Sequence, residues 1–175
     1  MAGKDQGLVG RRSARAVRAR RAAILIGLAI AAVAAVLAWK AGGGPAAPAP
    51  LSAASVAEIE QGREIYAQHC ASCHGANLEG EPDWRERKPS GRLPAPPHDD
   101  SGHTWHHPDE VLLAITRHGM RPPLAPADYQ SDMPGFEGVL DEAQIRAVLG
   151  FIASRWSEQS RAHQARIDRA HRDAR

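Results

Sequence analysis

The sequence predicts an all-α protein in which an N-terminal transmembrane helix precedes a domain of three or more helices. An uncharged stretch of 18 residues near the N-terminus is close to the roughly 20 residues that a helix needs to cross a bilayer. Three later segments repeat apolar residues at the spacing of one buried helix face. The segments between them are rich in Gly and Pro, which is typical of loops.

Charge is distributed unevenly along the chain. Residues 1–21 carry seven basic side chains and one acidic one, and residues 155–175 carry six arginines and three acidic side chains. Because the net charge of the whole chain is +2, residues 22–154 carry a net charge of −7. The predicted domain is therefore acidic. We expect no nucleic-acid binding, since a membrane flank and a solvated helix face account for the terminal arginines.

Residues 22–39 are the predicted transmembrane anchor, because Arg21 and Lys40 bound the uncharged stretch. An arginine-rich flank stays in the cytoplasm, so residues 1–21 form a basic cytoplasmic segment and the rest of the chain is exported. We therefore expect a single-pass protein of the bacterial inner (cytoplasmic) membrane, with its domain on the periplasmic or outer side. The alternative is a cleaved signal peptide, with a cleavage site among the small residues Ala34, Ala38 and Ala41.

Residues 40–54 are a predicted linker, since their Gly, Pro and Ala residues cannot form a packed core. The domain at residues 55–156 opens with a helix that runs from about Ser55 to His69. Ser52 or Ser55 is the predicted N-terminal cap of this helix. Its inward positions recur at helical spacing, and they are Ile59, Gly62, Ile65 and Tyr66.

Two further helices complete the predicted domain. The second covers about Val111 to His118, between a proline followed by two acidic residues and the glycine at position 119. The third begins after its cap, Asp141, and ends near Trp156. Residues 157–175 form a charged C-terminal tail that we expect to be weak helix or disordered, because it contains few apolar residues. The third helix turns Ile145, Val148, Leu149, Phe151 and Ile152 toward the core.

The motif Cys70-Ala71-Ser72-Cys73-His74 reads C-x-x-C-H, which is the attachment signature of a c-type haem. Each of the two thiols can add to one vinyl group of a porphyrin, and His74 is then held beside the iron as an axial ligand. The chain has two cysteines, so one covalently attached haem c accounts for both. A thioredoxin-like dithiol needs a βαβ setting that is not evident here. A zinc site needs further ligands, and although His69 and His74 could supply them, zinc ligands are rarely so close together in a sequence.

These features together resemble the class I c-type cytochromes over about Ser55 to Trp156. Residues 94–119 are similar in particular to monohaem cytochromes of bacterial membranes. The resemblance implies a cytochrome c-like fold of helices around one haem, with the N- and C-terminal helices of the domain crossing. The supporting positions lie in both helices, at Gly62 and Tyr66 in the first and at Val148, Gly150 and Phe151 in the last.

The resemblance also implies the second axial ligand, because the run from Ser131 to Phe136 is similar to the axial-methionine loop of that family. The predicted ligands of the iron are thus His74 and Met133. A thioether ligand favours Fe(II) and raises the reduction potential. Met120 or a histidine is the competing ligand, and a core-filling role for Met133 is the structural alternative.

In this family a proline carbonyl often accepts the second ring N–H of the haem histidine, and such contacts tune the metal. Pro94, Pro96 and Pro97 are the candidates, and we expect Pro96. The sequence departs from the family pattern at His98, where an apolar residue is usual.

Histidines are concentrated beside this stretch, together with Trp105. A bound metal such as copper is one interpretation. We prefer a polar loop around the haem edge, because no ligand set with convincing spacing is present. The five histidines are His98, His103, His106, His107 and His118.

The sequence therefore predicts an electron carrier and not an enzyme in its own right. It would accept single electrons from a membrane donor and pass them to a terminal oxidase or reductase. One alternative is a haem-containing subunit of an oxidase or reductase, or a haem sensor, with an open sixth site on the iron. Another is a periplasmic metal-handling protein that uses the histidine-rich loop.

Overall fold

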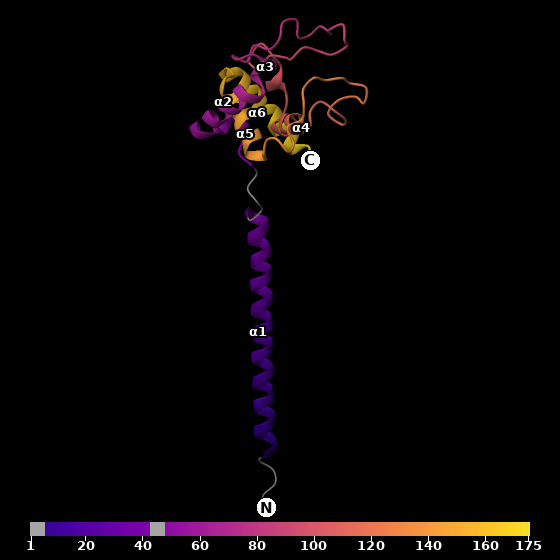
Figure 1. Ribbon diagram of the computed structural model, residues 1–175. Helices are drawn as coiled ribbons and strands as arrows, with labels where there is room; N and C mark the ends of the chain where they lie inside the picture. The colour runs from indigo at the N-terminus through magenta and orange to yellow at the C-terminus, as the bar shows by residue number, and fades with distance from the viewer. Residues whose placement is uncertain (1–5, 43–47) are drawn as a thin grey trace, which may run out of the picture. The chain divides into compact units, whose positions relative to one another are not determined.

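Six α-helices and two short 3-10 helices form the regular structure of the described residues, which include no strand (Figure 1). This computed structural model describes residues 6–42 and 48–175, with the backbone alone for residues 6–19, 22 and 40–42. Parts of the predicted basic segment and linker, at residues 1–5 and 43–47, lie outside the described residues. The helical content of the described residues confirms the all-α part of the predicted fold class.

The chain divides into two units, one ending at Pro48 and the other beginning at Ala49, and each is described by itself. The first contains α1 (Gln6–Gly42). Its large apolar side chains are exposed where they are described, as Ile24 and Trp39 illustrate. Over the described residues, no helix has the combination of length and apolar character that a membrane crossing requires. The transmembrane anchor therefore stays a prediction.

The second unit contains the remaining elements. It opens with η1 (Leu51–Ala53) and α2 (Val56–His69), and α2 leads directly into the short α3 (Ala71–His74). A long loop then precedes η2 (Thr104–His106) and α4 (Asp109–His118), and another precedes α5 (Glu142–Ser154) and α6 (Glu158–Asp173). Both loops project beyond the helices (Figure 1).

The three predicted helices of the domain are present, and their starts follow from local side-chain chemistry. The Ser55 hydroxyl accepts the backbone N–H of Glu58, whose carboxylate accepts the backbone N–H of Ser55 in return. Asp141 and Gln144 form the same reciprocal cap at the start of α5. Pro108 is the N-cap of α4, one position before the first helical position, which is the position that proline prefers.

Helices α2 and α5 pack closely, and a glycine allows their approach. A Cβ added to Gly62 of α2 would overlap the backbone carbonyl of Ala147 and lie 2.9 Å from the Cβ of Phe151 in α5. One turn along α2, the Tyr66 ring packs against Phe151 with centroids 5.5 Å apart. The helix contact that the resemblance implies is therefore present, and it forms one wall of the core.

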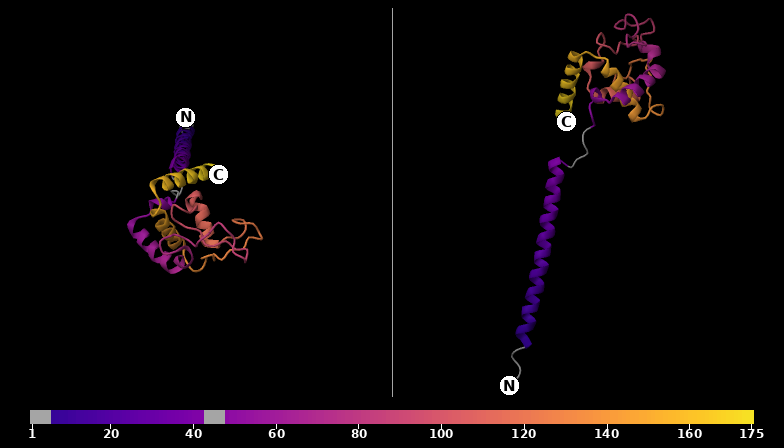
Figure 2. Two further views of the ribbon diagram at one scale, coloured as in Figure 1. Left: turned by 90° about the horizontal axis from the view of Figure 1, so that it is seen from above. Right: turned by 90° about the vertical axis from the view of Figure 1, so that its left-hand side faces the viewer.

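The prediction of weak helix or disorder for the C-terminal tail is wrong. Residues 158–173 form α6, which lies along the outside of the second unit (Figure 2). Its buried face is polar instead of apolar: Ser160, Gln164 and Asp168 recur at four-residue intervals and are at most 5% exposed. A search for apolar periodicity does not detect such a helix, because buried hydrogen bonds attach it to the domain.

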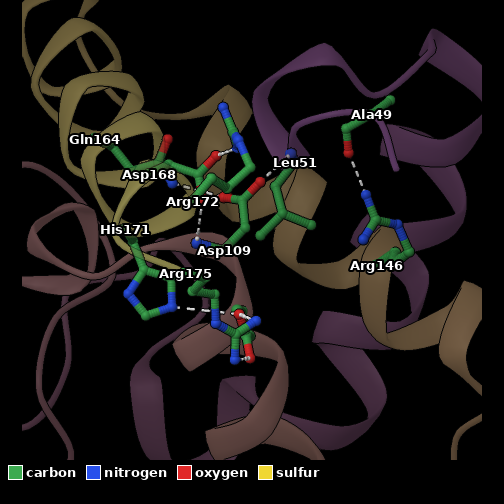
Figure 3. Close-up of polar contacts among 10 residues, drawn as sticks. Ala49, Leu51, Asp109, Arg146, Gln164, Asp168, His171, Arg172 and Arg175 are labelled. Carbon is green, nitrogen blue, oxygen red and sulfur yellow. Dashed lines mark hydrogen bonds and ion pairs between the residues drawn. The ribbon is translucent and has the colours of Figure 1, made fainter. Parts of the chain in front are cut away.

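The attachment centres on the carboxylate of Asp109, at the start of α4 (Figure 3). One oxygen accepts the side-chain N–H of Gln164 at 2.6 Å, and the other accepts the backbone N–H of Leu51 at 2.9 Å. The backbone N–H of Asp109 is donated to Asp168 at 3.1 Å, and Asp168 pairs with Arg172. Three segments that are distant in sequence thereby meet at one buried acidic residue.

Candidate functional site

The C-x-x-C-H motif is held on a single helical turn. Cys70 ends α2 and caps α3, and its carbonyl accepts the backbone N–H groups of Cys73 at 3.1 Å and His74 at 2.9 Å. The Tyr66 hydroxyl donates to the carbonyl of Gly75 at 2.8 Å, which fastens the end of the motif to α2. The turn presents both sulfur atoms and the imidazole from one short piece of backbone.

Both sulfur atoms are free thiols that line one cavity with His74. Cys70 is partly buried, and Cys73 is exposed. Burial, together with the neighbouring Cys73, raises the pKa of the Cys70 thiol to about 11, so this group keeps its proton at neutral pH. Addition of a thiol across a vinyl group uses both the sulfur and its hydrogen, and Cys70 keeps this protonated form.

His74 is 7% exposed, and its Nδ1 lies 2.8 Å from the carbonyl oxygen of Pro96. A carbonyl only accepts, so Nδ1 carries the proton and the lone pair of Nε2 is available to a metal. Burial lowers the pKa of His74, which favours the neutral imidazole that a metal ligand requires, although the Pro96 contact acts in the opposite sense. Of the three candidate prolines, Pro96 therefore makes the contact that the resemblance implies.

The segment that contains Pro96 is itself fixed against the loop that follows the motif. The backbone N–H of Glu81 is donated to the carbonyl of Ala95 at 2.8 Å, and the Glu81 carboxylate accepts the N–H of Ala95 at 2.6 Å. Gly80 has φ +70° and would place a Cβ 2.5 Å from the nitrogen of Pro97. Only glycine combines that backbone angle with so close an approach.

The cavity has a volume of about 640 Å³, within the range of small-molecule and cofactor sites. The motif lines one part of it, and the loop that carries Met133 lines another. Its floor comes from α4 and α5 and is apolar, as a porphyrin ring requires. Its lining includes the branched aliphatic and phenyl side chains of Leu93, Val111, Leu112, Ile115, Leu124, Phe136, Val148, Leu149 and Ile152.

The methionine loop is tied to the end of α4. The backbone N–H of Phe136 is donated to the carbonyl of Thr116 at 3.0 Å, and that of Glu137 to Arg117 at 2.9 Å. The N–H of Met133 is donated to the Ser131 hydroxyl at 3.0 Å. Met133 packs against the core as well as lining the cavity.

Met120 also lines the cavity, so the structure brings both candidate methionines to the same site. The surroundings of Met133 favour it, because its loop is fastened at several points and its side chain contacts the core. The role of Met133 as an iron ligand stays a prediction.

The histidine cluster separates into two groups. His98, His103 and His107 line the cavity, whereas His106 and His118 do not. Several of these rings contact other rings: His103 stacks on Trp84 with centroids 5.3 Å apart, and the ring centroids of His106 and Trp105 are 3.8 Å apart. Within the part of the chain that the structure describes, no group of three His, Cys, Asp or Glu side chains is placed to hold a metal ion.

Three supporting residues were not evident from the sequence. Glu81 bridges the two loops beside His74, Thr104 contacts His98, and the Trp156 indole N–H is donated to the carbonyl of His98 at 2.8 Å. Each acts across at least six positions of the chain, and no local spacing signals such contacts.

Comparisons with known proteins agree with this geometry. A family model described as "Cytochrome C oxidase, cbb3-type, subunit III" matches residues 57–152. The chain is also similar to "Cbb3-type cytochrome c oxidase subunit FixP" of Rhizobium etli, with 28% identity over 94 residues. The alignment covers 54% of this chain and 29% of that relative, so the chain spans less than a third of its length. No solved structure matches.

Proposed function

We propose that this chain, which belongs to the cbb3-type cytochrome c oxidase subunit III family, carries single electrons on one haem c. The observation that carries the proposal is the placement of Cys70, Cys73 and the neutral His74 on the wall of one apolar cavity. This donor set fits haem, since two thiols suit the two vinyl groups and an imidazole suits the iron.

Attachment of the porphyrin requires no oxidant. Cys70 and Cys73 would each add across one vinyl double bond, with a carbon–sulfur bond formed and the thiol hydrogen passed to the other vinyl carbon. Haem, when bound, supplies the Fe(III)/Fe(II) couple. Pro96 orients His74, and the apolar side chains that line the cavity would cover a bound porphyrin and exclude water from it.

We assign the second axial position to Met133. The fastening of its loop to α4 and its contact with the core support this assignment. With both axial positions filled, the ligand set changes little between the two oxidation states. In the alternative, a sensor or a ligand-binding subunit with an open sixth site, Met133 would not be a ligand of the iron.

The proposed location is the bacterial inner membrane, with residues 22–39 as a single-pass anchor and the haem domain on the periplasmic side. The uncharged sequence between Arg21 and Lys40 supports this, as does its place within the continuous helix α1, whose described large apolar side chains are exposed. Arginines on the N-terminal side favour a cytoplasmic N-terminus.

The proposed electron acceptor is a cbb3-type terminal oxidase, and the proposed donor is another component of the membrane. The relative from Rhizobium etli is named as a subunit of such an oxidase, which supports the acceptor. The chain would be a bound subunit or a mobile donor of that complex, and the oxygen chemistry would belong to the oxidase.

Haem content and spectra of the purified full-length protein test this proposal. We expect one haem per chain that stays attached after denaturation, and a low-spin reduced spectrum that carbon monoxide does not alter. Cys70→Ala with Cys73→Ala should abolish covalent haem, whereas Ser72→Ala, within the same motif, should retain it. Absence of covalent haem in the wild-type chain would refute the carrier, and ready binding of carbon monoxide would favour the open sixth site.

A further inference from the structure

We propose that His98 is a positioning residue for His74, which fixes the plane of the axial imidazole and lowers the reduction potential of the haem iron. The inference rests on the proposed role of His74 as an iron ligand. It concerns the residue at which the sequence departs most clearly from the family pattern.

The two imidazole rings are stacked. Their centroids are 4.0 Å apart, and their planes differ by 25°. The other restraint on the His74 ring is the hydrogen bond from Nδ1 to Pro96, which acts at one edge. An edge contact alone leaves the ring free to tilt about that contact. A second ring against its face removes this freedom, so the two contacts together define the ligand plane.

His98 can act in this way because it is held on three sides. A hydrogen bond of 2.8 Å joins its Nδ1 to the hydroxyl of Thr104. Its backbone N–H is donated to Leu78 at 2.8 Å, and its carbonyl accepts the indole N–H of Trp156 at 2.8 Å. Leu78, Thr104 and Trp156 are all buried. The restraint on His74 therefore extends to the end of α5.

The chemical nature of the ring gives the direction of the effect. The imidazole of His98 carries two polar nitrogens, so it is more polar than the aliphatic side chain expected at this position. Ferric haem carries one more positive charge than ferrous haem, and polar surroundings stabilise that charge. His98 should therefore favour the ferric state relative to an aliphatic residue.

Two substitutions separate the stacking from the polarity. His98→Phe keeps a flat ring against His74 but removes the polar nitrogens, and His98→Leu removes both. We expect both variants to raise the reduction potential. The ferric low-spin EPR spectrum depends on the orientation of the axial ligand, so it should stay sharp in His98→Phe and broaden in His98→Leu.

The measurements are redox titration and EPR spectroscopy of the purified full-length protein. His106→Leu is the matched control, since His106 does not line this cavity and its ring contacts Trp105 and His163. It should leave both readouts unchanged. Thr104→Val keeps the shape of Thr104 but removes the partner of His98, and it should shift both readouts less than His98→Leu.

An unchanged potential and an unchanged EPR spectrum in His98→Leu would overturn the inference and leave His98 as a space-filling residue. If His98→Leu fails to bind haem, the same readouts in Thr104→Val decide, and no change there overturns the inference. A wild-type chain without low-spin haem c would instead refute the proposed function. The two failures are therefore distinguishable.

Discussion

At the scale of the residue, the protein depends on a few side chains that share one cavity wall. Cys70, Cys73 and His74 lie on one turn, and the carbonyl of Pro96 selects the tautomer of His74 that leaves Nε2 free. The two sides of the cavity are therefore defined by different kinds of structure. This side of the site is defined by the motif and its hydrogen bonds, whereas Met133, the proposed second ligand, lies in a loop.

The assignment of that second ligand can be tested by replacing Met133 with leucine. The substitution removes the thioether but nearly conserves volume. We expect the weak red-end absorption band of Met-ligated ferric haem to disappear and the reduction potential to fall, because the thioether favours Fe(II). Optical spectra with a redox titration measure both effects. Met120→Leu is the control, and loss of the band in that variant alone would reassign the ligand.

At the scale of the element, the helices of the second unit differ in what holds them. Helices α2 and α5 pack through apolar contact and the close approach at Gly62. Helix α6 lies beyond the residues that the family model matches, and it buries polar side chains around Asp109 (Figure 3). Its stability contribution therefore depends on satisfied hydrogen bonds, which are costly to break when buried.

The contribution of α6 can be measured through Gln164, which is 2% exposed. Gln164→Ala leaves one oxygen of the buried Asp109 carboxylate without its side-chain donor. We expect the free energy of unfolding to fall by about 1.5–3 kcal/mol, as for a lost hydrogen bond to a charged group. Denaturant unfolding of the haem-loaded chain measures it. Gln159→Ala changes an exposed glutamine of the same helix, and equal losses in the two variants would contradict the assigned role.

At the scale of the whole molecule, the family match confirms the c-type cytochrome domain that the motif and its helices indicate. Charge is the other global property. Residues 22–154 carry a net charge of −7, whereas the terminal segments are basic. An acidic domain is attracted to a partner with a basic docking surface, and such attraction acts on the rate of encounter.

The charge predicts a salt dependence for electron transfer. The rate of transfer between the reduced protein and a basic redox protein should fall as ionic strength rises, because salt screens attraction between exposed charges. Stopped-flow kinetics over a range of salt concentrations measure this rate. An uncharged small-molecule oxidant is the control and should react at a nearly constant rate. A rate with the basic protein that rises with salt would contradict electrostatic steering by the acidic domain.

Sequence patterns predicted most of the domain and part of the site. Capping residues such as Ser55 and Asp141 mark helix starts, because they bond to a backbone N–H three residues away. The C-x-x-C-H motif is equally local. Contacts such as that of Trp156 with His98 join residues 58 positions apart, and no spacing signals them. Helix α6 escaped detection because its buried face is polar, which apolar periodicity does not report.

The sequence by itself determined the helical class of the domain, the capped starts of α2 and α5 and the residues that can attach a haem, since these depend on chemistry within a few positions of the chain. Only the tertiary structure decided that Pro96 contacts His74, that His98 stacks on the same ring and that the C-terminal residues close on Asp109. These outcomes depend on which distant segments meet when the core forms. Packing and buried hydrogen bonds select those contacts, and their energies arise only in the folded chain.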